Sequence, residues 1–160
     1  MNKKCIMIAC AFFVAVALQA KVSLPAFFSD GMVMQQQSQA SLWGNASKGK
    51  IVEVTTGWDG QTYTTRADEQ GKWKLTVQTP AAGGPYDITF DDGERTRIKD
   101  ILMGELWICS GQSNMEMPMK GFKNQPVEDA NMDVLRSRNS QIRLFTVKRN
   151  SQFAPVDDVT

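Results

Sequence analysis

The chain is organised around the stretch Gly104-Glu-Leu-Trp-Ile-Cys-Ser-Gly-Gln-Ser-Asn-Met-Glu116, in which an apolar run changes abruptly into small polar residues. The run from Leu106 to Cys109 is apolar on both faces, which is typical of a buried strand in a parallel sheet. Ser113 follows in a loop, and open α/β sheets place catalytic groups at the carboxyl ends of their strands. Gly111 can adopt conformations that other residues avoid, so we expect a sharp turn that presents the Ser113 hydroxyl outward.

Residues 21 to about 100 carry the pattern of short β-strands separated by turns. Apolar residues alternate with polar ones over Lys50–Thr56 and Lys72–Val77, which predicts strands with one apolar face. Asp59-Gly60 and Asp92-Gly93 are typical two-residue hairpin turns. Gly83-Gly84-Pro85 is expected to break the chain between strands. Short strands with turns at this spacing predict a β-sandwich.

The pattern changes after Asp100, where the order of elements predicts one βαβ unit of a parallel sheet. The run that ends at Cys109 is followed by a loop over Met115–Pro126, a helix over Val127–Arg138 and a second strand over Gln141–Lys148. Such a unit has no core of its own, because domains usually contain ~100–150 residues. The expected fold class is therefore mixed, with a β-sandwich followed by the incomplete start of an α/β domain.

The chain contains no histidine, and this absence limits its chemistry more than any other feature of the composition. Ester hydrolysis by a serine nucleophile needs a base that works near neutral pH, and His usually provides it. Because this chain cannot supply that base, we expect it to be the N-terminal part of a longer enzyme. The formal net charge of +1 implies no polyanionic partner. No spacing of metal ligands, phosphate loop or basic-aromatic stretch is present, so neither a metal, a cofactor nor nucleic acid is expected.

The first 20 residues have the pattern of a secretory signal. The basic pair Lys3-Lys4 precedes an apolar run over Cys5–Leu18, and Ala17-Leu-Gln-Ala20 suits a cleavage site. The run is shorter than the ~20 residues that a membrane helix needs, so no stable membrane span is expected after signal removal. The sequence therefore predicts a secreted or periplasmic protein. The alternative is a lipoprotein that is cleaved before Cys10.

A resemblance to a known family extends this interpretation. The segment Ser110-Gly-Gln-Ser-Asn-Met-Glu116 resembles the nucleophile block of the SGNH hydrolases, in the Gly-Gln-Ser-Asn form of the sialate O-acetylesterase branch. Earlier tracts resemble that branch in order and spacing: Leu24-Pro-Ala-Phe-Phe-Ser-Asp-Gly-Met-Val-Met-Gln35, Trp43-Gly44, Gly71-Lys-Trp73, Gly83-Gly-Pro-Tyr86 and Ile98-Lys-Asp-Ile-Leu-Met-Gly-Glu105. The resemblance implies a signal peptide at 1–20, a β-sandwich at 21–100 and, from 101 to 160, the start of a flavodoxin-like hydrolase domain that continues in other members.

The resemblance also assigns roles within the block. Ser113 is the candidate nucleophile, and its backbone N–H is a candidate oxyanion donor. Gly111, Gln112 and Asn114 are assigned to substrate contact or loop support, with loop support preferred for Asn114. The family's catalytic Asp and His belong to a late Asp-x-x-His block that this chain does not contain. The alternative is that these residues form only a tight polar turn.

Other residues have a plainer interpretation. Glu116 could act as a general base only if burial raised its pKa, so a carboxylate that supports the loop is preferred. Cys109 is interpreted as a small buried apolar residue rather than a catalytic thiol. Sugar stacking is an alternative for Trp43, Trp58 and Trp73; however, Trp73 is expected in the core, and Trp58 beside a hairpin is the better candidate for exposure.

The expected function is the removal of O-acetyl groups from sialic acids through an acyl-serine, by a secreted carbohydrate esterase of which this chain is the N-terminal part. The partner would be an O-acetylated sialic acid or a related acetylated glycan. Alternatives are an acetyl esterase acting on plant polysaccharide and a non-catalytic carbohydrate-binding β-sandwich. Without a histidine, the 160 residues alone are expected to be inactive.

Overall fold

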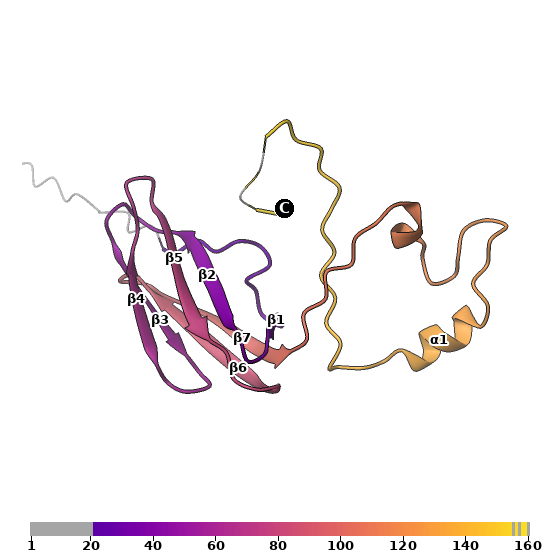
Figure 1. Ribbon diagram of the computed structural model, residues 1–160, viewed down its shortest axis with the longest axis horizontal. Helices are drawn as coiled ribbons and strands as arrows, with labels where there is room; N and C mark the ends of the chain where they lie inside the picture. Colours follow the sequence, from indigo (N-terminus) through magenta and orange to yellow (C-terminus); the bar gives the residue numbers. More distant parts are fainter. Residues whose placement is uncertain (1–20, 155, 157, 160) are drawn as a thin grey trace, which may run out of the picture.

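The computed structural model describes residues 21–154, 156, 158 and 159, so the predicted signal at 1–20 lies outside the described residues. Within them, all strands precede residue 105 and both helical elements follow it (Figure 1). The elements in chain order are β1 (Val33–Gln35), β2 (Gln39–Asn45), β3 (Ile51–Thr56), β4 (Thr62–Arg66), β5 (Lys72–Gln78), β6 (Gly83–Asp91), β7 (Arg95–Gly104), the 3-10 turn η1 (Ser113–Glu116) and α1 (Ala130–Arg136). The described chain is therefore mostly β with one α-helix.

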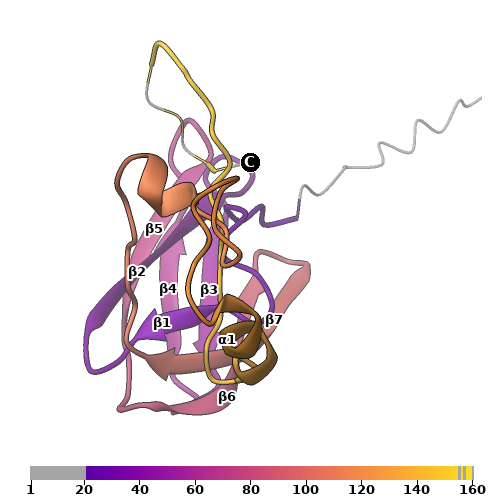
Figure 2. The same cartoon turned by 90° about the vertical axis from the view of Figure 1, so that its right-hand side faces the viewer.

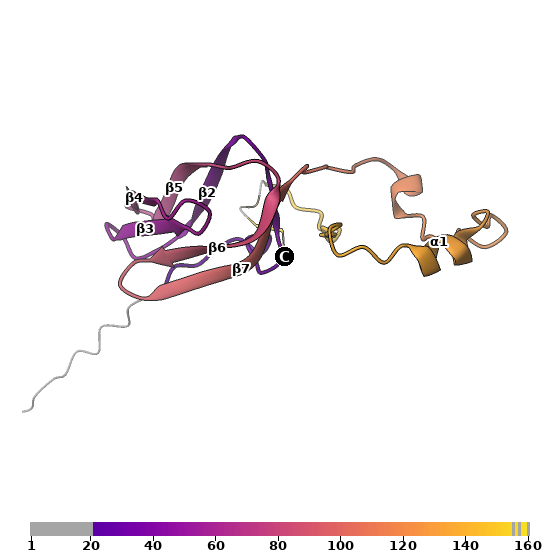
Figure 3. The ribbon, with the colours of Figure 1, turned by 90° about the horizontal axis from the view of Figure 1, so that it is seen from below.

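The strands form two sheets, which we call together the β region (residues 21–104) (Figures 1 and 3). The larger sheet has the order β1-β7-β6-β3-β4; β1 and β7 are parallel and the other pairs are antiparallel. The smaller sheet is the antiparallel ribbon β2–β5. The Thr65 hydroxyl of β4 donates to the Lys74 carbonyl of β5 at 3.0 Å, which links the edges of the two sheets. The β-sandwich and the boundary at residue 100 stay predictions, and β7 runs across that boundary.

The predicted hairpins are confirmed as strand pairings, but their loops are longer than the two residues expected. β3 pairs antiparallel with β4 across Asp59-Gly60, and β6 pairs with β7 across Asp92-Gly93. Gly60 has φ +70° and Gly93 has φ +110°, and residues with a Cβ rarely adopt positive φ angles of this kind. The expected break at Gly83-Gly84-Pro85 is wrong, because these residues lie inside β6. The ladder to β7 is only irregular there, between Gly83 and Tyr86.

The hydrophobic core of the β region takes side chains from both sheets. Burying each large apolar side chain contributes ~1.5–3 kcal/mol. Trp73 is buried as predicted, and its ring centroid lies 5.9 Å from that of Phe90. Trp58 is half-buried rather than exposed, because its indole Nε1 donates to the Gln78 carbonyl at 3.1 Å. The fully buried core side chains are Leu42, Val52, Val54, Val77, Ile88, Phe90 and Ile101.

Strand β7 ends at Gly104, so the predicted buried strand from Leu106 to Cys109 is wrong. The reason is that both ladder neighbours end with it. β1 last pairs through Gln35 with Gly104, and β6 first pairs through Gly83 with Met103. Without neighbouring strands, the backbone N–H and C=O groups of residues 106–109 can bond only to water, and apolar side chains do not replace those strand hydrogen bonds.

Residues 105–154, 156, 158 and 159, which we call the arm, extend away from the β region and return toward it (Figures 1 and 3); Figure 2 views the arm end-on, in front of the β region. The predicted helix over Val127–Arg138 is confirmed in part, as the shorter α1, in which only Ala130 is buried. The strand expected over Gln141–Lys148 is wrong, since those residues form none, and the βαβ unit is not formed in the described residues. No helix in that part of the chain has the length and apolar character to cross a membrane.

Candidate active site

Ser113 opens the 3-10 turn η1 and is exposed. Gln112 before it is extended, with φ −105° and ψ −151°, and its carbonyl accepts the Met115 N–H at 2.9 Å. The Asn114 carbonyl accepts the Met117 N–H at 3.3 Å. No hydrogen bond to the Ser113 hydroxyl or its backbone N–H forms among the described residues. The structure thus places Gln112, Ser113 and Asn114 on one turn, and their catalytic and supporting roles stay predictions.

Gly111 has no unusual backbone angle, and it lies close to the half-exposed side chain of Met115. Its φ is not in the positive region, so the expectation of a special conformation is wrong. A Cβ at this position would lie 2.6 Å from Met115 Cγ, closer than non-bonded carbons approach. The absent side chain therefore lets the turn fold back over its own entry.

Glu116 closes the same turn through an ion pair. Its Oε1 lies 2.6 Å from Nε of Arg149, so the outgoing and returning stretches of the arm touch at this point. Both side chains are largely exposed, and pairs of that kind contribute little to stability. Sequence reasoning missed Arg149, because nothing local connects it with Glu116.

The arm leaves the β region through a group that we call the exit anchor, made of Gln35, Gln36 and Glu105. The Gln35 and Gln36 amides donate to the Glu105 carboxylate at 3.2 and 2.8 Å. Gln35 also accepts the Leu106 N–H at 2.9 Å, and Gln36 accepts the Ala82 N–H at 2.8 Å. The Gln36 amide, and then the Gln35 amide, hold the pKa of Glu105 below its usual value. This carboxylate therefore stays charged and fixes the first residue of the arm.

The arm returns through a second group, the return anchor, made of Asp100 and Arg143. The guanidinium meets the carboxylate in a two-pronged contact, Nη1 to Oδ2 at 2.9 Å and Nη2 to Oδ1 at 3.1 Å. Nη1 also donates to the Gly31 carbonyl at 3.0 Å. The Arg143 hydrogen bond lowers the pKa of Asp100 and raises that of Arg143. Paired bonds between planar groups fix orientation as well as distance.

Neither anchor was identified from the sequence. The partners lie far apart in the chain, and the individual residues are ordinary. The one available signal was that Glu105 and Asp100 lie in the tract from Ile98 to Glu105, and Gln35 ends the tract from Leu24, both of which carry the family resemblance.

The apolar residues before Ser113 are exposed. The exposed fractions are 81% for Trp107 and 90% for Ile108, and Cys109 is exposed as well. The prediction of a buried Cys109 is therefore wrong, because no described segment packs over this stretch. An exposed apolar run of this kind is typical of a surface that packs against another polypeptide segment.

Ser113, the candidate nucleophile, has no base beside it among the described residues. Ser113 presents a free hydroxyl, but the chain has no histidine, and the nearby carboxylate Glu116 is paired with Arg149. Among the described residues, no three His, Cys, Asp or Glu side chains come together in a way that could hold a metal ion. The site can therefore attack an ester only if a base reaches Ser113 from outside these residues.

Comparisons with known proteins give a consistent picture, although no family model matches the chain. It is 28% identical over 144 residues to the sialate O-acetylesterase of Mus musculus, covering 84% of this chain and 26% of that protein. It is 29% identical over 131 residues to the sialate O-acetylesterase of Homo sapiens, covering 76% of this chain and 24% of that protein. The predicted resemblance is thus confirmed, and the chain spans about a quarter of the length of these relatives.

A solved structure agrees with the curated relatives. The fold is similar to a carbohydrate acetylesterase from Xanthomonas citri, with a TM-score of 0.78 and 31% sequence identity. The similarity covers 88% of this chain and 31% of that one. It therefore includes both the β region and much of the arm.

Proposed function

We propose that this chain forms the nucleophile-bearing part of an esterase that removes O-acetyl groups from sialic acids, with Ser113 as the nucleophile. The similarity to sialate O-acetylesterases over 76–84% of the chain is the observation that carries the proposal. It is supported by the position of Ser113, which opens an exposed turn with its hydroxyl unoccupied. The similarity to a carbohydrate acetylesterase supports acetylated sugars as the substrate class.

The reaction follows from the serine chemistry. The Ser113 oxygen attacks the acetyl carbonyl carbon while a base takes its proton, and the sugar hydroxyl leaves with a proton returned by that base. Water then attacks the acyl-serine and releases acetate. The base must come from outside these 160 residues, because they contain no histidine.

The backbone of η1 supplies one element of this chemistry. The N–H groups at the start of a helical turn lack partners within the turn and can donate to an anion. The free N–H of Ser113 is the proposed donor to the oxygen that becomes negative as the carbonyl is attacked. Such stabilisation is strongest where water is excluded, so the exposed turn must be covered during the reaction.

The exposed apolar side chains explain how such cover would form. Trp107 and Ile108 precede the block, and Leu144 and Phe145 lie in the returning stretch. A polypeptide segment that packs on these side chains would bury them and enclose Ser113 in the same step. We also propose that residues 1–20 direct export of the protein across the inner or plasma membrane. The enzyme would then meet its glycans outside the cytoplasm.

The test uses the protein expressed from its complete natural reading frame. Acetate release is measured with O-acetylated sialic acid and, in parallel, with an acetylated neutral polysaccharide. A fluorophosphonate probe followed by peptide mapping identifies the reactive serine. We expect release from the sialic acid, labelling of Ser113, and a fall in kcat of about 10⁴-fold in Ser113→Ala.

Ser110→Ala is the matched control, because Ser110 lies in the same exposed block and has no assigned role in bond making. It should keep most of the activity and the Ser113 label. Labelling of a different serine, or unchanged kcat in Ser113→Ala, would contradict the nucleophile assignment. Release from the neutral polysaccharide alone would contradict the sialic acid specificity and leave the ester chemistry in place.

A further inference from the structure

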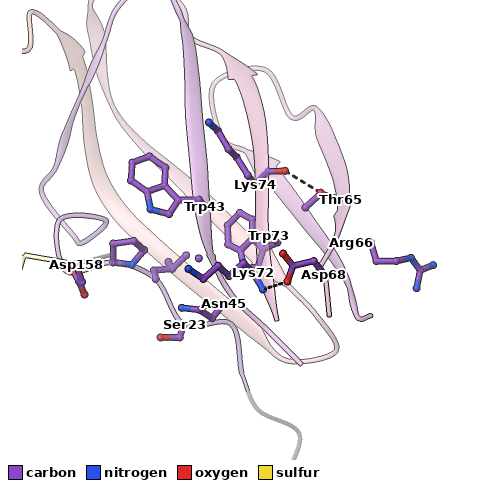
Figure 4. A pocket seen from close by; sticks show the side chains of 13 residues that line it. Ser23, Trp43, Asn45, Thr65, Arg66, Asp68, Lys72, Trp73, Lys74 and Asp158 are labelled. Carbon is purple, nitrogen blue, oxygen red and sulfur yellow. Dashed lines mark hydrogen bonds between the residues drawn. The ribbon is translucent and has the colours of Figure 1, made fainter. Parts of the chain in front are cut away.

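A groove of about 590 Å³ crosses the outer face of the β2–β5 ribbon, on the β region and not on the turn that bears Ser113 (Figure 4). Aromatic, charged and neutral polar side chains line it together, a mixture typical of sites that orient a small polar molecule. The lining residues that matter for the argument are Ser23, Trp43, Asn45, Arg66, Asp68 and Lys74. The groove takes no part in the proposed ester chemistry.

Trp43 provides an aromatic surface in this groove. Its neighbours Leu42 and Gly44 are buried, so strand alternation places the Trp43 side chain on the outer face of β2. Phe27 and Phe28 pack against the indole, with ring centroids 5.2 and 4.9 Å away. Trp43 is of intermediate burial, so the two phenylalanines hold its indole in place while part of the residue stays exposed.

Several charged groups of the groove are already occupied. The Asp68 carboxylate accepts the backbone N–H groups of Gln70 and Lys72, at 2.9 and 2.8 Å. Asp158 accepts the Ala26 N–H at 2.9 Å. Arg66 donates through Nη1 to the Gly49 carbonyl at 2.6 Å. These groups shape the groove and offer a ligand few of their bonds.

Three other side chains of the groove, those of Lys74, Asn45 and Ser23, are available to a ligand. Lys74 lies directly opposite Trp43 in the β2–β5 ladder and is exposed. Within the described residues, its ammonium forms no hydrogen bond or ion pair, and neither do the side-chain amide of Asn45 and the hydroxyl of Ser23. A free cation and two neutral hydrogen-bonding groups therefore line the same groove as the Trp43 ring.

We propose that this groove binds an acidic glycan, with the apolar C–H face of a pyranose ring on Trp43 and the sugar's carboxylate at Lys74. Asn45 and Ser23 would hydrogen-bond the sugar hydroxyls. The choice of a carboxylate-bearing sugar rests on the proposed function, since a sialic acid is such a sugar. A second binding point on the same glycan raises the effective concentration of acetylated units near Ser113.

The experiment measures binding rather than turnover. The complete natural protein carrying Ser113→Ala is titrated with sialyllactose, and with lactose as the neutral control. Binding is followed through the tryptophan indole N–H signals by NMR, with the Trp43 signal assigned from Trp43→Phe. We expect the Trp43 signal to shift with sialyllactose only, and the affinity to fall as salt is raised.

Lys74→Gln is the decisive variant, because Lys74 is exposed and its loss leaves the core intact. Its affinity for sialyllactose should fall ~10-fold, the effect of losing one charged hydrogen bond. Lys99→Gln removes an exposed lysine of β7 that does not line the groove, and it should bind as before. Trp43→Ala should abolish the binding, but Lys74→Gln keeps the test valid if that variant folds poorly.

Three results would overturn the inference: no shift of the Trp43 signal, equal affinity for lactose, or equal affinity of Lys74→Gln and Lys99→Gln. These binding results do not depend on whether the protein has esterase activity. Groove binding without acetate release by the Ser113 protein would contradict the proposed function and retain the groove. Acetate release without a Trp43 shift would do the reverse.

Discussion

The β region and the arm differ in what holds them together. In the β region, side chains such as Val54 and Phe90 are completely buried. In the arm, the exposed fraction of Leu144 is 91%, and polar contacts at Glu105 and Arg143 attach the backbone to the β region. The difference shows that apolar side chains stabilise a segment only where neighbouring strands or helices supply surfaces to bury them against.

Matched truncations in the two regions give the largest expected effect. Phe90→Ala should lower the free energy of unfolding by about 3–5 kcal/mol, because it opens a cavity in the core. Leu144→Ala should change it by less than about 0.5 kcal/mol, since the side chain is already in water. Urea unfolding followed by tryptophan fluorescence measures both. A similar cost for the two variants would mean that the arm contains a core of its own.

A glycine pair in the β region tests how tightly its core is packed. A Cβ at Gly44 would lie 2.4 Å from the Ser23 carbonyl oxygen, so Gly44→Ala should cost about 1–3 kcal/mol of unfolding free energy. Gly104→Ala is the control, because the nearest atom to its Cβ would be Val33 Cγ1 at an ordinary 3.9 Å. Thermal unfolding compares them, and a larger loss for Gly104→Ala would contradict the packing described.

The return anchor gives the arm its pH dependence. The folded-state pKa of Asp100 is lowered, so its contribution is present above the unfolded pKa of ~3.9 and is lost as pH falls through the folded value. Limited proteolysis should therefore cut the arm severalfold faster as the pH drops below the folded-state pKa of Asp100. Asp100→Asn should give fast cleavage already at neutral pH, while Asn still tolerates the φ of +58° found at this position.

The β region supplies the reference for that experiment. The buried hydrophobic side chains of its core do not titrate in this range, so cleavage within residues 33–104 should stay slow across the same pH range in both proteins. Equal cleavage of the arm in wild type and Asp100→Asn at neutral pH would show that Arg143 does not attach it.

The smallest effect is expected at the surface pair of the arm. Glu116→Gln removes the charge that meets Arg149, and exposed pairs contribute little, so stability should stay the same within error. Hydrogen exchange of the amides of η1 should nevertheless become modestly faster, because the turn loses its contact with the returning stretch. Unchanged exchange would show that the turn holds its own shape.

The sequence predicted local features well and distant ones poorly. Asp59-Gly60 and Asp92-Gly93 predicted hairpins because a turn of that kind depends on adjacent residues. The parallel pairing of Val33 with Leu102 had no local signal, and the end of β7 at Gly104 depends on that pairing. Gly83-Gly84-Pro85 was mistaken for a break, because its flanking ladder keeps it within a strand.

The same distinction applies to the candidate site. The block around Ser113 was found because its residues are contiguous and resemble a family motif. Leu106–Cys109 was assigned to a buried strand on apolar character alone, which cannot tell whether neighbours are present. Arg143 could not be paired with Asp100 in advance, because a long-range ion pair leaves no periodic pattern in the sequence.

The parallel contact between β1 and β7 has a consequence for how the protein is made. β1 begins at Val33, but its ladder partner Leu102 is synthesised much later, so the large sheet cannot close until nearly all of the β region exists. At ~5–20 residues per second, β1 waits roughly 3–14 s for its partner on the ribosome. During that interval Met34 keeps its apolar side chain in water, beside strands that still have open edges. Contacts so distant in sequence are slow to form, so the moment at which β7 emerges sets the earliest time at which the β region can fold.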